Sequence, residues 1–347
     1  MRVLGPRDAR LNGTAMAQID QFDRLQQLGT GAYSTVSLVR RRGKSSAVLL
    51  PFLALKTIPR SKINSTVQAN HVFAERAALN TLADCPYTVT LHDTFKDETN
   101  LYFLMECVGG GPLHVHLRGA GKFVESTAQF YAAEISFALE ACHHHDIIYR
   151  DLKLSNVLLL KSGHIKLTDF GFAKVVPWGE KTMTYCGTPH AMAPEILLKQ
   201  KYGREVDWWA FGVLLYEMMM GKPPTGYRIG ALEENSILSG LVNANFPPAV
   251  FGKDPQKDLP DQNAKTCICQ CWSVDPTTRL GGTTAHGAAE IHAHPWMSNV
   301  VEDIRLGNIT PPSPNPNHFS FEANDFNGED TVSSSLTAQE QLLFADF

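Results

Sequence analysis

Acidic and amide side chains stand directly beside two short apolar runs in the middle of the chain. Asp151 and Asn156 precede the run VLLL, and Asp169 ends the strand-like segment HIKLTD. Because these residues lie where neighbouring strands begin or end, we expect their oxygen atoms to converge. Carboxylate and amide oxygens suit a Mg²⁺ ion that shares its ligands with a substrate phosphate. The pattern predicts a magnesium site held by Asn156 and Asp169, with Asp151 close to it.

A lysine and a glycine-rich turn further upstream supply groups that bind phosphate. Lys56 lies on the short apolar strand LALKTI, and Glu75 lies in the apolar stripe of a helix predicted over 66–82. Since a carboxylate in such a stripe is costly unless a cation meets it, we expect Lys56 to pair with Glu75. The backbone of the loop that contains Gly29 and Gly31 can approach phosphate oxygens closely.

Two differently built parts of the chain carry these groups. From Phe22 to about Val108 the pattern favours strands around one helix, with a hairpin turning at KDETN. After GGGP it favours helices, with long ones over 125–145 and 206–220. The second of these is too short for the ~20 residues of a membrane span and contains Glu217, so we expect a buried helix.

The motifs GTGAYSTV, YRDLKLSN, DFG and APE follow one another along the chain in this order. The set resembles the eukaryotic protein kinases, over about Phe22 to Trp296 and into the tail. Within that family FDRLQQLGTG, FYAAEI and TDFGFAK resemble the AGC group, and in particular the catalytic subunit of cyclic-AMP-dependent protein kinase. Lys153 with Thr188 resembles the serine/threonine rather than the tyrosine pattern. The resemblance implies transfer of the γ-phosphoryl group of ATP to serine or threonine hydroxyls of proteins.

The resemblance also implies the fold. It is an α+β, bilobal protein kinase fold, with a small, mostly β lobe that contains one key helix and a larger, mostly α lobe. A C-terminal tail is expected to dock on the small lobe. The corresponding boundaries are an arm over 1–21, the small lobe over 22–108, the large lobe over 109–298 and the tail over 299–347.

Catalytic roles follow from the matching positions. Asp151 would orient the acceptor hydroxyl and take its proton, and Lys153 would neutralise the transferring phosphoryl group. Lys56 would hold the α and β phosphates of ATP, with Glu75 orienting it. The catalytic set implied in this way is Asp151, Lys153, Asn156, Lys56, Glu75, Asp169 and Thr188, of which Asn156 and Asp169 hold Mg²⁺.

An apolar slot for adenine is implied by the same resemblance, with Met105 as its gatekeeper. The backbones of Glu106 and Val108 would bond the base. Taken singly, these residues are also explained as ordinary core residues. The cofactor-binding set is Leu28, Gly29, Gly31, Ser34, Val36, Ala54, Lys56, Met105, Glu106, Val108, Leu158 and Thr168. Ser34 replaces the third glycine of the family's loop, which puts the closeness of that loop to the phosphates in question.

Thr184, in KTMTYCGTP, matches the activation-loop phosphosite of the family, and an ordinary loop hydroxyl is the alternative. A phosphate there carries close to two negative charges and needs cations. His71, Arg150 and Lys174 stand where the family keeps those partners. An upstream activating kinase is the corresponding partner.

Substrate recognition is where the chain departs from the family that it resembles. The implied substrate-binding residues are Glu217, Tyr185, Pro189 and Met192. Acids that bind basic substrate residues in the cyclic-AMP-dependent enzyme are replaced here by Pro112, Ser155 and His190. Our hypothesis is a weakened or altered preference for arginine upstream of the acceptor. Met183 replaces a tryptophan that helps to dock a cyclic-nucleotide-binding regulatory subunit, so control by such a partner is left open.

Composition and cysteine spacing limit the expected partners, the cellular compartment and the metal sites. The net charge of −4 gives no reason to expect nucleic acid or an anionic membrane as a partner. Seven cysteines without framework spacing suit a reducing compartment, and we expect a cytoplasmic protein, with a nuclear location left open. The spacing of Cys267, Cys269 and Cys271 does not fit a zinc site, and His143 to His145 read as a polar helix end.

Two other functions compete with an active kinase. A catalytically idle scaffold would bind only nucleotide or partners, but it would not need an intact proton acceptor and metal pair. Phosphoryl transfer to a small molecule is disfavoured by the Lys153 and Thr188 pattern.

Overall fold

The computed structural model describes residues 19–42, 52–224 and 261–313 of the 347 residues. The chain divides into two compact units. The described part of the first unit runs to Ala69 and also contains Leu91–Cys107, and the second contains Asn70–Thr90 and the described residues from Val108 onward. Residues 1–18 of the predicted arm and the predicted docking of the tail lie outside the described residues. The predicted boundaries between lobes stay predictions.

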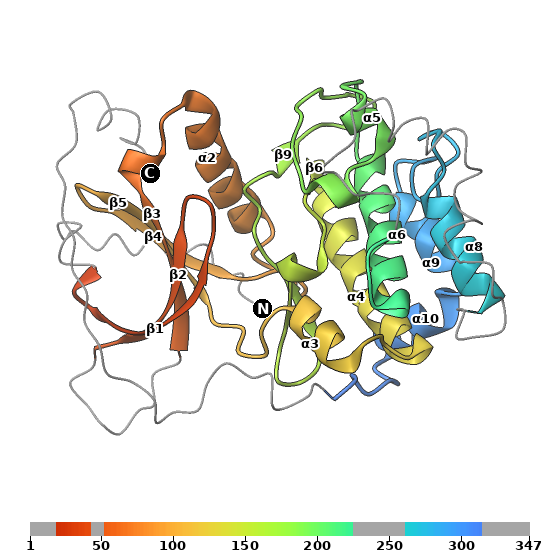
Figure 1. Cartoon of the computed structure of the whole chain (residues 1–347), viewed down its shortest axis with the longest axis horizontal. Helices are drawn as coiled ribbons and strands as arrows, with labels where there is room; N and C mark the ends of the chain where they lie inside the picture. Colours follow the sequence, from red (N-terminus) through yellow and green to blue (C-terminus); the bar gives the residue numbers. More distant parts are fainter. Residues whose placement is uncertain (1–18, 43–51, 225–260, 314–347) are drawn as a thin grey trace, which may run out of the picture. The chain divides into compact units, whose positions relative to one another are not determined.

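An antiparallel five-stranded sheet forms most of the first unit (Figure 1). Its strand order is β1-β2-β3-β5-β4, and the predicted hairpin is confirmed as β4 and β5. The strands are β1 (Phe22–Thr30), β2 (Thr35–Arg41), β3 (Phe52–Pro59), β4 (Leu91–Lys96) and β5 (Asn100–Glu106). A short 3₁₀ turn, η1 (Arg60–Lys62), follows β3.

The two faces of this sheet differ, because side chains alternate along each strand. One face builds an apolar cluster around Leu55 and Leu104, which lie opposite each other on β3 and β5. The other face carries Ala54 and Lys56, two residues apart on β3. Tertiary packing of the first face therefore determines which way the Lys56 side chain leaves the sheet.

Helix α2 (Thr66–Thr81) confirms the predicted helix. The expected apolar stripe is buried, with exposed fractions of 7% or less at Val72, Leu79 and Leu82. Glu75 lies in the same stripe and is only 3% exposed. The carboxylate is therefore held away from water, as the spacing predicted.

The second unit is mainly helical, with α4 and α6 packed against each other at its centre (Figure 1). Its helices are α3 (Leu113–Ala120), α4 (Glu125–His144), α5 (Pro194–Leu197), α6 (Glu205–Met220), α8 (Gln262–Cys271), α9 (Gly287–Ala293) and α10 (Ser298–Leu306). Two small two-stranded antiparallel sheets complete it, β6 (Ile147–Ile148) with β9 (Lys174–Val175) and β7 (Val157–Leu159) with β8 (Ile165–Leu167). The 3₁₀ turns η2 (Leu154–Asn156) and η3 (Pro189–Ala191) border these pieces.

Helix α6 is buried around its whole circumference, which its apolar sequence requires. It packs against both α4 and α8. Gly212 makes the approach to α8 close, because a Cβ there would lie 2.7 Å from the Cβ of Cys271. Gly221 ends the helix with φ 73°, a left-handed conformation that favours glycine. α6 is thus the central helix on which the loops of the candidate site rest.

The end of α4 differs in part from the prediction. His144 and His145 are exposed, as a polar helix end requires. His143 is instead buried, because its Nε2 lies 2.8 Å from a carboxylate oxygen of Asp207 on α6. Within the described residues, no helix is both long enough and apolar enough to cross a bilayer.

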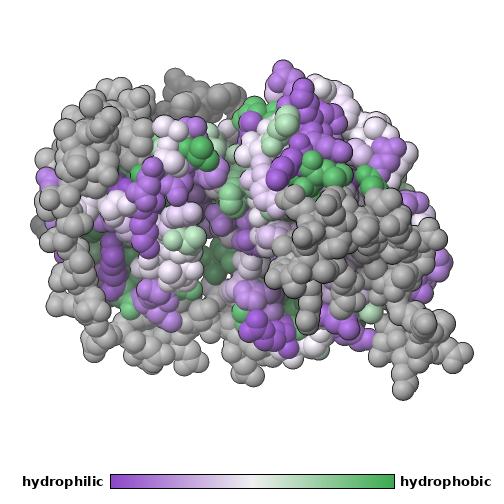
Figure 2. Space-filling model, turned by 45° about the horizontal axis from the view of Figure 1, so that its top comes forward, coloured by the Kyte–Doolittle hydropathy of each residue, from purple (hydrophilic) through white to green (hydrophobic). Residues whose placement is uncertain are grey.

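Hydrophobic residues at the described surface appear in Figure 2 as small groups among hydrophilic ones. Several large ones belong to a single segment that runs from β9 past α5. They are Val175, Trp178, Met183, Tyr185 and Leu198, with exposed fractions of 40% to 63%. This segment contains the predicted phosphosite.

Candidate active site

Asp151 is the centre of a cluster of hydrogen bonds in the second unit. The Thr188 hydroxyl donates to its Oδ1 at 2.6 Å. Lys153 Nζ donates to its Oδ2 at 2.7 Å and to Thr188 Oγ1 at 2.8 Å. Asn156 Nδ2 donates to the same Oδ2 at 3.0 Å. Four predicted residues that are up to 37 positions apart in the chain therefore meet at one carboxylate.

The loop that contains Asp151 is held in place by Asp207, a residue whose role the sequence pattern did not indicate. Asp207 on α6 is 1% exposed and accepts hydrogen bonds from the backbone N–H groups of Tyr149 and Arg150, at 2.9 and 2.8 Å. With His143, these bonds satisfy its buried charge. The only sequence signal was a carboxylate in the first turn of a very apolar helix.

Two of the predicted residues adopt unusual backbone conformations. Arg150 has φ 68° and Asp169 has φ 59°, in the left-handed region that residues other than glycine rarely occupy. Such strain persists only where the surroundings over-determine it, and it concentrates at functional sites. In both cases the conformation fixes where the adjacent side chains point.

Gly171 lies between two carboxylates. A Cβ on Gly171 would lie 3.5 Å from Asp169 Oδ1 and 3.9 Å from Glu75 Oε2, so both acids approach the same glycine. Two such anions favour a cation between them. Lys56, the predicted partner, belongs to the first unit, and its pairing with Glu75 stays a prediction.

Several residues predicted to bind the nucleotide share one face of the sheet in the first unit. Val36 pairs with Lys56 across β2 and β3, and Ala54 pairs with Met105 across β3 and β5. Because Ala54 and Lys56 are two residues apart, all four side chains leave the same face. Glu106 ends β5, and Leu28 lies within the register shift between Gln27 and Gly29 in β1.

The glycine loop between β1 and β2 is a tight turn. Gly31 N donates to Ser34 O at 2.8 Å. A Cβ on Gly31 would lie 3.1 Å from Ser34 Oγ, so the serine side chain faces this glycine. Gly29 has open space around its Cα.

The second unit contains the remaining predicted nucleotide residues. Leu158 on β7 lies opposite Lys166 and forms an isolated bridge with Pro112. Thr168 N donates to Asn156 O at 2.9 Å, and Thr168 O accepts from the Tyr149 hydroxyl at 2.5 Å. These bonds join the segment that follows β8 and leads to Asp169 to the loop that contains Asp151. Val108 begins the second stretch of this unit, which also contains Asn70–Thr90.

The predicted phosphosite lies beside cationic side chains. The Arg150 guanidinium donates to the Phe172 carbonyl at 2.6 Å and to the Tyr202 hydroxyl at 3.0 Å, and that hydroxyl donates to the Thr184 carbonyl at 2.6 Å. Lys174 Nζ donates to Thr182 Oγ1 at 2.8 Å, and Thr182 Oγ1 lies 3.4 Å from Thr184 Oγ1.

His71, on α2, lies edge-on to Phe172 with ring centroids 5.3 Å apart. Burial and the Arg150 charge lower its pKa. Lys174 thus contacts Thr182, and Arg150 reaches the Thr184 carbonyl through the Tyr202 hydroxyl. His71 contacts Phe172, whose carbonyl accepts from Arg150, and its role as a partner of the phosphosite stays a prediction.

The residues predicted to bind substrate have different exposures. Tyr185 is 50% exposed and Pro189 is also exposed, whereas Met192 is 4% exposed. His190 lies near the catalytic cluster: burial and the Lys153 charge lower its pKa, while Asp151 raises it. Glu217 on α6 is partly buried, and burial raises its pKa to about 6.

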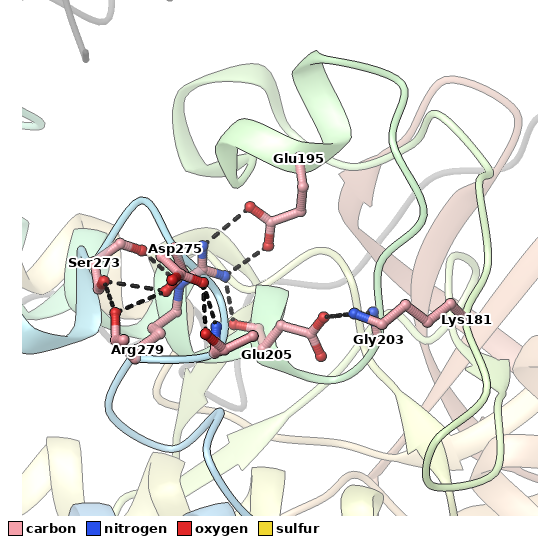
Figure 3. A network of polar contacts seen from close by, with 9 residues as sticks. Lys181, Glu195, Gly203, Glu205, Ser273, Asp275 and Arg279 are labelled. Carbon is pink, nitrogen blue, oxygen red and sulfur yellow. Dashed lines mark hydrogen bonds and ion pairs between the residues drawn. The ribbon is translucent and has the colours of Figure 1, made fainter. Parts of the chain in front are cut away.

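A buried ion pair anchors the segment that follows Thr188 (Figure 3). Arg279 has an exposed fraction of 0% and donates to both carboxylate oxygens of Glu195 on α5, at 2.6 and 3.0 Å. Its guanidinium also donates to the carbonyls of Ser273 and Glu205, both at 3.0 Å. The two-pronged pair fixes α5 at the end of the segment that starts with Asp169.

Comparison with known proteins agrees with this geometry. Residues 22–297 match the protein kinase domain family. The chain belongs to the protein kinase family. The resemblance found in the sequence is thereby confirmed, and the strand-rich first unit and helical second unit agree with the fold that it implies.

Among the relatives is the cAMP-dependent protein kinase catalytic subunit of Dictyostelium discoideum, 37% identical over 286 residues, which cover 82% of this chain and 41% of the relative. The Serine/threonine-protein kinase YPK1 of Saccharomyces cerevisiae is 39% identical over 315 residues, or 90% of this chain and 43% of the relative. The human cAMP-dependent protein kinase catalytic subunit PRKX is 38% identical over 297 residues, or 85% of this chain and 76% of the relative. The chain thus spans less than half the length of the first two.

Proposed function

We propose that this chain is an active serine/threonine protein kinase that transfers the γ-phosphoryl group of ATP to protein hydroxyls. The observation that carries the proposal is the convergence of Lys153, Asn156 and Thr188 on the Asp151 carboxylate. A carboxylate held in this way can accept a proton from an incoming hydroxyl. A scaffold that only bound partners would not need this arrangement.

The residues of the chain divide the work of the reaction. Asp151 orients the acceptor hydroxyl and takes its proton. Lys153, which already bonds Asp151 and Thr188, places its ammonium beside the reacting oxygens and offsets developing negative charge. The Thr188 hydroxyl bonds both Asp151 and Lys153 and keeps these two side chains in position. Catalysis of this kind consists mainly of positioning and charge stabilisation.

ATP and Mg²⁺ are the cofactors that this proposal requires, and members of the family use both. Asn156 donates its amide N–H to Asp151, which directs the amide oxygen away from that carboxylate, and Asp169 supplies a second oxygen donor. This all-oxygen set fits Mg²⁺, which would neutralise the phosphate charge when bound. The sheet face with Val36, Ala54, Lys56 and Met105 would take the nucleotide, together with Leu158 and Thr168.

Regulation through Thr184 belongs to the same proposal. A phosphate on Thr184 would meet Arg150, Lys174 and His71, and it would replace part of the present Lys174 to Thr182 contact. An upstream kinase is then the expected partner. The exposed apolar side chains of the same segment offer a surface to protein substrates or to a regulatory subunit.

The residues that stand where the family binds basic substrate side chains favour an altered substrate preference. His190 is neutral at pH 7, because its pKa is lowered by burial and by Lys153, and Ser155 is an exposed hydroxyl. Neither attracts a basic side chain. Of the acids that bind basic substrate residues in the cyclic-AMP-dependent enzyme, Glu217 is the one that this chain keeps. We therefore expect weak selection for arginine upstream of the acceptor, and a positional peptide library that returned strong arginine selection would contradict this.

Labelled ATP and a mixed protein substrate test the proposal. Asp151→Asn should lower phosphoryl transfer by on the order of 10²–10⁴-fold, since it removes the proton acceptor and keeps the shape. The matched control is Glu302→Gln, which removes an exposed carboxylate on α10. No transfer by the wild-type chain, or equal transfer by wild type and Asp151→Asn, would favour the scaffold.

A further inference from the structure

Tyr202, in the connection between α5 and α6, is bound to the segment that contains the predicted phosphosite. Its backbone N–H donates to the Thr182 carbonyl at 2.9 Å, and its own carbonyl accepts from the Thr182 N–H at 2.8 Å. Tyr202 has an exposed fraction of 1%. Because these bonds fix its backbone and burial fixes its ring, the direction of the Tyr202 hydroxyl is set by the fold.

The Tyr202 hydroxyl links Arg150 to the backbone of the phosphosite. It donates its one proton to the Thr184 carbonyl at 2.6 Å, so it is the acceptor of the hydrogen bond from the Arg150 guanidinium, at 3.0 Å. Hydrogen bonds from a cation are about twice as strong as neutral ones, and they polarise the next bond in a chain. Arg150, Tyr202 and Thr184 thus form a hydrogen-bonded relay that runs from the loop containing Asp151 to the phosphosite.

Arg150 is held in this relay without an anionic partner. It has an exposed fraction of 7%, and its guanidinium donates to the Phe172 carbonyl at 2.6 Å and to the Tyr202 hydroxyl, which are both neutral acceptors. Among the described residues, no carboxylate forms an ion pair with this guanidinium. A buried charge is costly unless its donors are satisfied, so each of these acceptors is needed. The positive φ of Arg150 adds to this demand, since such a conformation persists only where contacts enforce it.

We propose that Tyr202 is a positioning residue that replaces the Thr184 phosphate as an acceptor for Arg150 while the chain is unphosphorylated. The inference rests on the proposed kinase function and concerns the regulation of the same site. By holding Arg150, Tyr202 keeps the adjacent Asp151 in place and maintains basal phosphoryl transfer. Once Thr184 carries a phosphate, Arg150 gains an anionic acceptor with a stronger bond, and the Tyr202 hydroxyl becomes dispensable.

The alternative role for Tyr202 is that of an ordinary buried ring. Its apolar contacts would then matter, or its hydroxyl would support the fold to the same extent with and without the phosphate. Tyr202→Phe separates these roles, because it keeps the ring and removes the oxygen that both accepts from Arg150 and donates to Thr184. The relay makes the effect of this substitution depend on the phosphate, whereas a structural role does not.

Steady-state kinetics with ATP and a protein substrate provide the first test. Tyr202→Phe is combined either with Thr184→Ala, which removes the hydroxyl, or with phosphothreonine incorporated at position 184 by genetic code expansion. In the Thr184→Ala chain, Tyr202→Phe should lower kcat at least about tenfold and change the KM for ATP little, since a hydrogen bond to a charged group is lost. In the phosphorylated chain it should lower kcat by about threefold or less. Equal losses in the two backgrounds, or no loss in either, would overturn the proposal.

Hydrogen exchange of the full chain provides a second test that needs no phosphoryl transfer. In the Thr184→Ala background, Tyr202→Phe should speed exchange of the Thr182 amide, which bonds the Tyr202 carbonyl, by about tenfold or more. The matched control is Tyr87→Phe, because the Tyr87 hydroxyl makes no hydrogen bond within the described part of the chain. This control should leave the exchange of the Thr182 amide unchanged.

Arg150→Gln breaks the relay at its other end and covers the case in which Tyr202→Phe fails to fold. It should raise the exchange rate at Thr182 as Tyr202→Phe does, and combining the two substitutions should add little. Unchanged exchange at Thr182 in both variants would overturn the proposal. Absence of transfer by the wild-type chain would contradict the proposed function, whereas the exchange rates decide on the relay alone, so the two failures are distinguishable.

Discussion

Replacing Glu195 by glutamine should cost far more stability than its small change in shape suggests. The substitution keeps the size of the side chain and removes its charge. Arg279 would then be a fully buried cation whose remaining acceptors, the carbonyls of Ser273 and Glu205, are neutral. Removing one member of a buried, hydrogen-bonded ion pair costs about 3–5 kcal/mol.

This cost is large relative to typical domain stabilities of about 5–15 kcal/mol. For domains of about 150–250 residues, each kcal/mol lowers the melting temperature by about 2–4 °C. Glu195 lies in the second unit, so Glu195→Gln should melt about 6–20 °C below the wild type. Thermal and urea unfolding monitored by circular dichroism would measure the difference. Both methods should give the same sign.

The matched control lies in the same network. Lys181 pairs with Glu205 at 3.0 Å, but the lysine side chain is 44% exposed, so solvent screens the pair (Figure 3). Lys181→Ala should cost no more than about 1 kcal/mol. Equal losses for Glu195→Gln and Lys181→Ala would refute the assignment of the Arg279 pair as a buried anchor. A near-neutral double change, Glu195→Leu with Arg279→Leu, would agree with it, because no charge then stays buried alone.

Four further outcomes follow from the structure. Thr184→Ala should strongly lower phosphoryl transfer in a peptide assay. Near-wild-type turnover would contradict the assignment of Thr184 as an activating phosphosite. Asp207→Asn should weaken the acceptor bonds of the Tyr149 and Arg150 amides and lower kcat at least tenfold (about 1.4 kcal/mol) with a smaller change in KM. The raised pKa of Glu217 penalises the folded state above pH 6 and relieves it as the pH falls toward 4.5, so Glu217→Gln should stabilise the chain by about 1–2 kcal/mol at pH 7.5 and not at pH 4.5. Burial and then Arg305 lower the pKa of His292 to about 4, so its neutral form contributes stability that is complete above pH 6.5 and lost toward pH 4, and His292→Gln should flatten that part of the unfolding profile.

Local patterns in the sequence were sufficient for the helices, the hairpin and the family. The burial of Glu75 within the stripe of α2 could be predicted because residues three and four apart lie on the same face of a helix. The motif around Asp151 also identified Lys153 and Asn156, two of the residues that meet there, because a loop of six residues keeps Asp151 and Asn156 close in any fold.

The other features of the candidate site depended on contacts between segments that are distant in the sequence. Asp207 supports the Asp151 loop from 57 and 58 positions away, and nothing local marks it for that role. Lys174 contacts Thr182 rather than Thr184, and His143 is buried instead of lying at a polar helix end. Each of these depends on how α6 and the segment before α5 pack.

The sequence by itself therefore determined which chemical groups this protein has and which family it belongs to, since motifs and helical spacing are short-range properties. Only the tertiary structure decided which groups share a hydrogen bond and which charges are buried. The physical reason is that burial and contact are set by the packing of whole helices around α6, and this packing is a property of many distant residues at once.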